Sequence, residues 1–135
     1  MSLTNNYFHY WIDSKKDEEI KKFQECIDSY IYFKKDTMLI TNKLIRDNRN
    51  FHAPKLLKTF LLLFSRDINK LKLAKDTLKS ITVDNINNHF HKYLEVAKLW
   101  INNDLKNLLN KLELIIKENP KDIFAIRLFH FNNIF

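Results

Sequence analysis

Apolar residues recur at intervals of three and four along almost the whole chain, which is the spacing of one helix face. The clearest example begins near Thr82 or Asp84 and ends at 102–104, where the sequence reads Asn-Asn-Asp. The interval resumes over 105–118 and ends at Asn119-Pro120, because proline has no backbone donor and disfavours a helical conformation at the residue before it. Asp122 can cap a third helix that starts at residue 123. This part of the chain therefore predicts two helices joined by a tight turn, followed by a further helix. The first of these helices carries its apolar face on Ile86, Phe90, Tyr93, Ala97 and Trp100.

The upstream half predicts four more helices by the same spacing. Asp13 or Ser14 can cap the first, the second covers about 36–46, and Pro54 suits the first turn of the third. The fourth follows a turn at 65–67, and its lysines at 70, 72, 75 and 79 are expected to face solvent. The third helix is the most apolar, so Leu61 in its middle is expected to be fully buried. The core-facing positions of the four helices include Phe23, Ile27, Leu39 or Ile40, Leu44, Leu57, Phe60, Leu61, Ile68, Leu71, Ala74, Leu78 and Ile81.

Seven helical segments with short turns and no strand signal predict an all-α fold. The chain has no glycine, so its turns must use Asn, Asp and Ser, which tolerate left-handed geometry better than other residues. Residues 1–13 form an N-terminal extension, and residues 14–135 form a single helical-repeat domain, either complete or truncated at its C-terminus. The aromatic residues of the extension are expected to pack on the domain, because together they would make a sticky exposed patch. They are Tyr7, Phe8, Tyr10 and Trp11.

A helical hairpin with a tight polar turn and a closing proline resembles a tetratricopeptide repeat, whose helices cannot bury their apolar faces alone. The segment LELIIKENPKDIFAIRLFH at 112–130 is similar to a stretch of the tetratricopeptide-repeat protein 38 family, and FQECIDSYIYFKKD at 23–36 resembles that family's opening helices. The resemblance spans roughly residues 17–135. It implies a solenoid of helical hairpins without established catalytic residues, in a family whose members usually continue well beyond this length. The fold expected is thus a right-handed array of antiparallel helical hairpins, a tetratricopeptide-like α-α superhelix of about seven helices.

In stacked hairpins the first helix of each repeat lines an inner groove. This register predicts a partner-binding groove, and Lys98 and Arg127 in it would suit an acidic or carboxylate-bearing segment of a partner protein. The function expected is a non-catalytic scaffold for protein-protein interaction. The groove residues are His91, Leu94, Lys98, Asn102, Arg127 and Phe131.

The sequence offers little for catalysis, so we expect no enzyme, no catalytic residue and no cofactor. A phosphate-binding loop needs glycine, and the chain carries none of the usual hydrolase or metalloprotease motifs. His89 and His91 lie two residues apart, so on a helix they point in nearly opposite directions and do not predict a metal site. The single Cys26 is expected to be a buried structural thiol, and His130 to make a core or inter-helix hydrogen bond.

The net charge of +7 raises an alternative function, a basic helical module that associates with RNA or DNA. However, 19 of the 23 basic residues are lysines, spread among 16 acidic residues rather than clustered with aromatics. This distribution favours a solvated helix surface. No apolar run exceeds the five residues 60–64, and the N-terminus does not have the order of a signal peptide. We therefore expect a cytoplasmic protein that does not interact with membranes.

The last helix is apolar on nearly every side, which predicts that something outside it covers part of its surface. A symmetric homodimer would satisfy such a patch with its own copy, and the continuation of a longer protein would do so as well. The residues concerned are Ile123, Phe124, Ile126, Leu128, Phe129, Phe131, Ile134 and Phe135.

Overall fold

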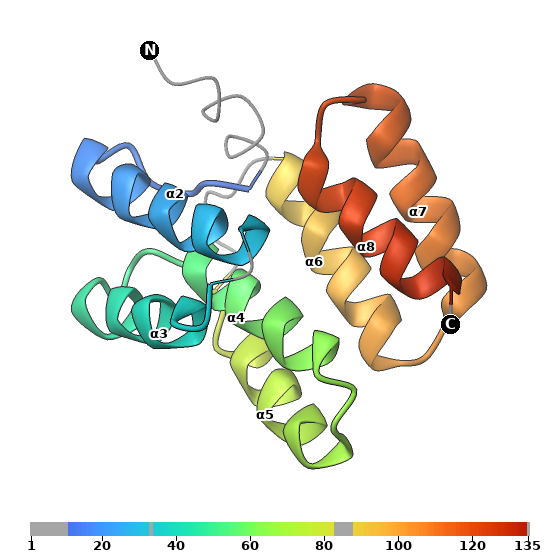
Figure 1. Ribbon diagram of the computed structural model, residues 1–135, viewed down its shortest axis with the longest axis horizontal. Helices are drawn as coiled ribbons and strands as arrows, with labels where there is room; N and C mark the ends of the chain where they lie inside the picture. Colours follow the sequence, from blue (N-terminus) through green and yellow to red (C-terminus); the bar gives the residue numbers. More distant parts are fainter. Residues whose placement is uncertain (1–10, 33, 83–87, 135) are drawn as a thin grey trace.

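The structure is a computed structural model that describes residues 11–32, 34–82 and 88–134. Residue 134 is described by its backbone alone. Within these residues the chain forms seven α-helices and no strand, which confirms the all-α prediction (Figure 1). The predicted start of the fifth helical segment near Thr82 or Asp84 is not tested, because 83–87, with Ile86, lie outside the described residues. The helices are α2 (Asp17–Ile31), α3 (Thr37–Asp47), α4 (Ala53–Phe64), α5 (Ile68–Lys79), α6 (Asn88–Ile101), α7 (Leu105–Glu118) and α8 (Ile123–Ile134).

Each helix packs against the next one in the chain, and α4 also contacts α2 and α6. The last helix packs back toward the first: the Arg127 side chain of α8 donates a hydrogen bond to the carbonyl of Ile31 in α2, at 3.2 Å. The rings of Tyr30 in α2 and Phe124 in α8 also lie 5.4 Å apart. The helices α2, α4, α6 and α8 therefore surround a common interior.

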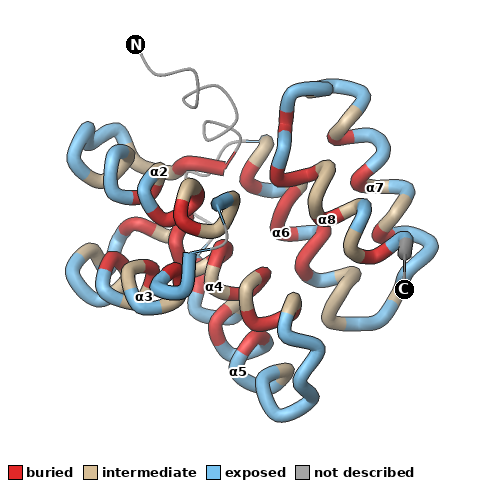
Figure 2. The backbone as a smooth tube through the Cα atoms, in the orientation of Figure 1, coloured by how far each residue is buried: buried red, intermediate tan, exposed pale blue. Residues whose placement is uncertain are grey.

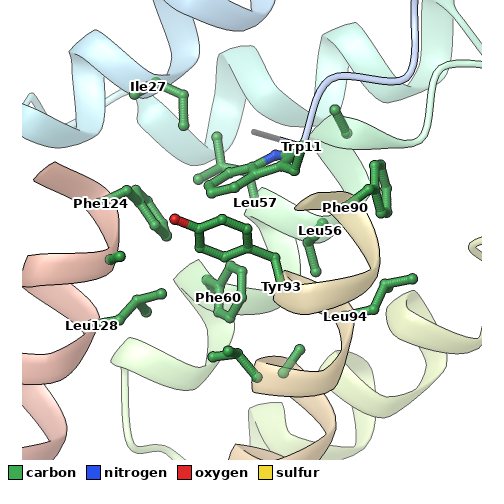
Figure 3. Packing of buried hydrophobic residues seen from close by; sticks show 14 of the residues in the cluster. Trp11, Ile27, Leu56, Leu57, Phe60, Phe90, Tyr93, Leu94, Phe124 and Leu128 are labelled. Atoms are coloured by element: carbon green, nitrogen blue, oxygen red, sulfur yellow. The ribbon is translucent and has the colours of Figure 1, made fainter. Parts of the chain in front are cut away.

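Trp11 lies in the centre of this interior and is only 3% exposed. Its ring is 4.5 Å from that of Tyr93 in α6 and 4.8 Å from that of Phe124 in α8 (Figure 3). The rings of Phe23 in α2 and Phe60 in α4 follow at 5.8 and 6.1 Å. One aromatic side chain from each of the four helices thus contacts the indole, an arrangement that buries a large apolar area and favours edge-to-face contacts.

The prediction that the N-terminal aromatics pack on the domain is confirmed for Trp11, while Tyr7, Phe8 and Tyr10 lie outside the described residues. Trp11 also brings Asp13 to the start of α4. The Asp13 carboxylate accepts hydrogen bonds from the backbone N–H groups of His52 at 2.9 Å and Ala53 at 3.0 Å. These donors have no partner within the helix, so an acceptor from 39 residues upstream completes the helix end.

The prediction that Asp13 or Ser14 caps the first helix is therefore wrong. Helix α2 begins at Asp17, and its N-cap residue Lys16 makes no side-chain capping hydrogen bond. Ser14 instead donates to the carboxylate of Glu19 at 2.5 Å. The three acidic residues of the first turn favour the positive end of the helix dipole without a polar cap.

The turns around α7 follow the sequence prediction. Asn103 takes the left-handed conformation with φ of 56°, and the Asp104 N–H donates to the carbonyl of Leu99 at 2.9 Å. This pairing is typical of a helix C-terminus, with asparagine in the place that glycine usually takes. At the other end, Asp122 accepts a hydrogen bond from the Ala125 N–H at 3.1 Å and caps α8 as expected. The turn before α5 also places Arg66 in the left-handed region, at φ 55°, which the sequence did not predict.

Some predicted core positions are wrong because neighbouring helices, rather than the apolar spacing alone, decide which face is covered. Leu61 is only half-buried, whereas Leu62 and Leu63 are buried. Ile68 is 81% exposed. Of the alternatives Leu39 and Ile40, Ile40 packs against the core and Leu39 is exposed. The other core-facing positions expected in the upstream half are buried or packed against the core: Phe23, Ile27, Leu44, Leu57, Phe60, Leu71, Ala74, Leu78 and Ile81.

Candidate partner-binding groove

An open groove of about 410 Å³ lies between α5 and α6. Apolar side chains from both helices contribute to its wall, and lysines stand at its edge. No acidic residue is among those that line it. The lining residues are Lys75, Leu78, Lys79, Ile81, Leu94, Lys98, Ile101 and Asn102.

The groove exists because α5 packs with only a narrow face. Of its 12 residues, only Ala74 and Thr77 are buried, and this small surface contacts the rest of the domain. In Figure 2 most of α5 is accordingly pale blue. The Thr77 hydroxyl donates to the carbonyl of Leu73 at 2.8 Å, so its polar group is satisfied inside the helix. The adjacent face of α5, which carries Leu71 and Leu78, is left partly open.

The electrostatics of the groove favour an anionic ligand. Lys75, Lys79 and Lys98 are all exposed and converge on one hollow from two helices. Between them lie Leu78, which is half-buried, and Leu94, which is only 4% exposed. The arrangement is that of an apolar floor with a cationic rim, in which carboxylates could pair with the lysines while apolar groups contact the floor.

A second hollow of about 380 Å³ continues the groove toward the turn between α4 and α5. The two hollows share Ile101 of α6, and both lie along α5, the first at Lys75, Leu78 and Lys79 and the second at Ile68 and Leu71. We call the two hollows together the path along α5. Six of the nine residues that line the second hollow are apolar, and its one carboxylate is that of Asp67. Its lining residues are Leu62, Leu63, Arg66, Asp67, Ile68, Leu71, Trp100, Ile101 and Asn103.

The structure brings together three of the six residues predicted to form the inner groove. Leu94, Lys98 and Asn102 line the groove between α5 and α6, with Leu94 as part of its buried floor. His91 is exposed on α6 but does not line this hollow. Sequence reasoning missed the contribution of α5, whose Lys75 and Lys79 were expected to be solvated.

The other two predicted residues, Arg127 and Phe131, belong to a different part of the molecule. The Arg127 guanidinium lies 5.8 Å from the centre of the Tyr30 ring and bonds α2. The Phe131 ring packs 4.9 Å from that of Phe64 in α4. The interior that α6 and α8 share is occupied by Trp11 and its aromatic neighbours, so these two helices do not line one open groove.

The structure also places the other residues that the sequence analysis considered as candidates for chemistry. Cys26 is buried, and burial raises the pKa of its thiol to about 11, which keeps it protonated and unreactive at neutral pH. His130 is exposed, so of the two expected alternatives the core position is wrong, and the inter-helix hydrogen bond stays a prediction. In the described part of the chain, no group of three or more His, Cys, Asp or Glu side chains is placed to hold a metal ion.

The Tyr93 hydroxyl donates a hydrogen bond to the buried carboxylate of Asp122. Burial raises the pKa of Asp122, and the hydrogen bonds from Tyr93 and the backbone lower it in part. Since Asp122 also caps α8, this pair connects α6 to the start of α8 inside the core. We assign it a structural role.

Helix α8 is covered more fully than its sequence predicts. Phe124, Ala125 and Leu128 are buried, whereas Ile123 is 41% exposed and Phe129 is half-buried. The side chains of 134 and 135 lie outside the described residues. The homodimer through this helix stays a prediction, with a smaller apolar surface to support it.

In comparisons with known proteins, no protein-family model, no curated protein and no solved structure matches this chain. Among the helices that the structure describes, none has the length and apolar character needed to span a membrane.

Proposed function

We propose that this protein is a non-catalytic helical-repeat scaffold that binds a partner protein, and that the groove between α5 and α6 receives an acidic segment of that partner. The repeat is taken to be tetratricopeptide-like, with α2–α3, α4–α5 and α6–α7 as successive hairpins. The resemblance to the tetratricopeptide-repeat protein 38 family is part of this proposal.

The observation that carries the proposal is the convergence of Lys75, Lys79 and Lys98 over an apolar floor. A lysine on a freely solvated helix face needs no apolar neighbours, whereas these three stand beside half-open leucine and isoleucine side chains. Rim charges of one sign steer an oppositely charged partner and set its orientation, while the apolar floor supplies the area that association needs.

A protein partner suits this groove better than a nucleic acid does. Phosphate-binding surfaces favour the planar fork of arginine and, for single strands, aromatic side chains on which bases stack. The hollow that holds the three lysines is lined by neither arginine nor an aromatic residue. Its floor of leucine and isoleucine matches apolar side chains of a peptide.

The test uses two variants with equal changes in net charge. Lys75→Glu with Lys98→Glu reverses the groove, and Lys106→Glu with Lys121→Glu changes two exposed lysines outside both hollows. Partners captured with the wild-type chain are then purified, and their affinities for all three proteins are measured by calorimetry. We expect the groove variant to lose about tenfold or more in affinity, while the control stays close to wild type.

The proposal fails if the folded groove variant keeps every partner at wild-type affinity. The nucleic-acid alternative is examined with an RNA oligonucleotide of random sequence at increasing salt. Binding that weakens steeply with salt, and that both variants lose equally, would assign the protein to that class instead.

A further inference from the structure

The groove has a shape that selects one kind of occupant. Along α5, Ile68, Leu71, Lys75 and Leu78 follow one another at intervals of three and four residues, so they form one continuous helix face. From α6, Leu94, Lys98 and Ile101 border the same path at the same intervals. Rows of side chains with this spacing form ridges and grooves that complement those of another helix.

The exposed part of this face is unexplained by the fold of the chain itself. Ile68 leaves 81% of its surface open, and Leu71 and Leu78 are only half-buried. The apolar spacing of α5 predicts that all three are inward. Leu71 and Leu78 pack against the core with part of their surface and line the hollows with the rest, and Ile68 lines the second hollow. Part of this apolar face is therefore on a surface that no helix among the described residues covers.

The path has a defined length. The 12 residues of α5 extend over about 18 Å at the helical rise per residue, and the two hollows follow this length. A partner helix of about three turns therefore spans the groove from end to end.

The charges of the groove are distributed unequally along this path. Lys75, Lys79 and Lys98 all line the hollow near Ile81, and none of them lines the hollow near Ile68. The far hollow contains the Asp67 carboxylate, which would repel an acidic side chain.

Arg66 also lines the far hollow, but its guanidinium is already engaged. It lies 4.5 Å from the centre of the Phe131 ring and donates to the Phe131 carbonyl at 3.4 Å. The far hollow therefore favours apolar side chains, which can contact Leu71 and Trp100.

A helix that carries acidic residues in its first turn gains twice from this arrangement, because the carboxylates interact with its own positive dipole end and with the three lysines. We infer that the groove binds an amphipathic helix of the partner protein, with an acidic N-terminal turn at the lysine hollow and an apolar C-terminal half at the Trp100 hollow. The bound helix runs parallel to α6 and antiparallel to α5. This inference rests on the proposed function and adds the form and direction of the ligand.

The test uses three synthetic peptides with fluorescent labels, each of roughly four helical turns. The first has glutamates in its first turn and an apolar stripe with helical spacing. The second has the same composition with the glutamates in its last turn. The third is the first peptide with one central proline, which breaks the helix. Fluorescence anisotropy gives their affinities for the full chain.

We expect the acid-first peptide to bind about tenfold more tightly than the acid-last peptide, and the proline peptide to bind more weakly than either. Ile68→Asp in the chain should weaken the acid-first peptide, because it puts a charge in the apolar hollow. Lys98→Glu should reduce binding of the acid-first peptide most, while Lys106→Glu, on an exposed position of α7, should leave it unchanged.

Three results would overturn the inference. Equal binding of the first two peptides would refute the direction, and undiminished binding of the proline peptide would show that the occupant is extended. Failure of all three peptides to bind would refute a helical occupant. In each case, binding of the purified partner distinguishes failure of this inference from failure of the proposed function. If Lys75→Glu with Lys98→Glu weakens binding of the partner, the groove remains the binding site. If it does not, the proposed function fails as well.

Discussion

Helices α4 and α5 have equal lengths and form one hairpin, yet they relate to the core in opposite ways. Nearly every side of α4 is covered, whereas α5 buries only Ala74 and Thr77. Both helices carry apolar residues at helical spacing, and Ile68 of α5 is nevertheless 81% exposed. The buried residues of α4 are Ala53, Pro54, Leu56, Leu57, Thr59, Phe60, Leu62 and Leu63.

The difference comes from the position of each helix in the array. Helix α4 has α2, α3, α5 and α6 as neighbours, while α5 packs mainly on α4 and touches α6 less extensively. Apolar spacing thus identifies a face that needs a partner, and the number of neighbouring helices decides whether that partner lies within the chain. For α4 it does, and for α5 part of the face remains open and borders the groove.

The largest expected effect comes from removing the Trp11 side chain, which contacts α4 and the other three inner helices. Trp11→Ala leaves a cavity between Phe23, Phe60, Tyr93 and Phe124, and it should lower the free energy of unfolding by about 3–5 kcal/mol. Denaturant unfolding measures this change. Tyr32→Ala, at a side chain that is 68% exposed, is the control and should change stability by less than about 0.5 kcal/mol. A small loss for Trp11→Ala would show that the N-terminal segment does not fill the interior.

The next largest effect is the loss of stability when a buried side chain of α4 is truncated, which we compare with the same change at an exposed position of α5. Leu57→Ala in α4 should cost about 2–5 kcal/mol, because the side chain is fully buried. Ile68→Ala in α5 should change stability by less than about 0.5 kcal/mol, and Leu61→Ala, at a half-buried position, should fall between them. The measurement is the midpoint of urea unfolding at constant slope. Equal losses at Leu57 and Ile68 would contradict the assignment of the open face.

The sequence predicts helices well in this chain because their ends have local causes. The break at 102–104, the end of α7 before Pro120 and the cap of α8 by Asp122 each depend on residues within one turn, and the structure has all three. The buried sides of α2 and α6 also follow the spacing, as Phe23, Phe90 and Tyr93 show.

Long-range packing is what the sequence does not reveal. Whether Ile68 is inside depends on how closely α6 approaches α5, and no local pattern encodes that distance. The same applies to Asp13, which accepts a hydrogen bond from a backbone N–H group 39 residues away, and to Arg127, which donates one to α2. Half of the candidate groove was predictable because it lies on α6, and the half on α5 depends on the angle between two helices.

A smaller effect tests the contact that joins the N-terminal segment to α4. Asp13→Ala removes the acceptor for the His52 and Ala53 N–H groups and should lower the free energy of unfolding by about 0.5–2 kcal/mol. Asp13→Asn keeps one acceptor oxygen and should cost less. Asp76→Ala, at an exposed position of α5, serves as the control in the same hairpin. If Asp13→Ala and Asp76→Ala change stability equally, the long-range cap contributes nothing.

The smallest effect is a change in how stability depends on pH, and it tests the buried interior, where Asp122 at the start of α8 contacts Tyr93 of α6. Burial raises the pKa of Asp122 above its ordinary value of 3.8, so the folded chain binds this proton more tightly than the unfolded chain does. The contribution of the group to stability is therefore fully present below pH 3.8 and is lost as the pH rises through the folded pKa. Asp122→Asn keeps a capping oxygen and removes the titration. The free energy of unfolding of the wild type should therefore fall relative to that of the variant as the pH rises. Tyr93→Phe removes a hydrogen bond that lowers this pKa, and the window of loss should then extend to higher pH. Unfolding curves measured between pH 3 and 8 would contradict the assignment if the difference between wild type and Asp122→Asn grew in favour of the wild type as the pH rose.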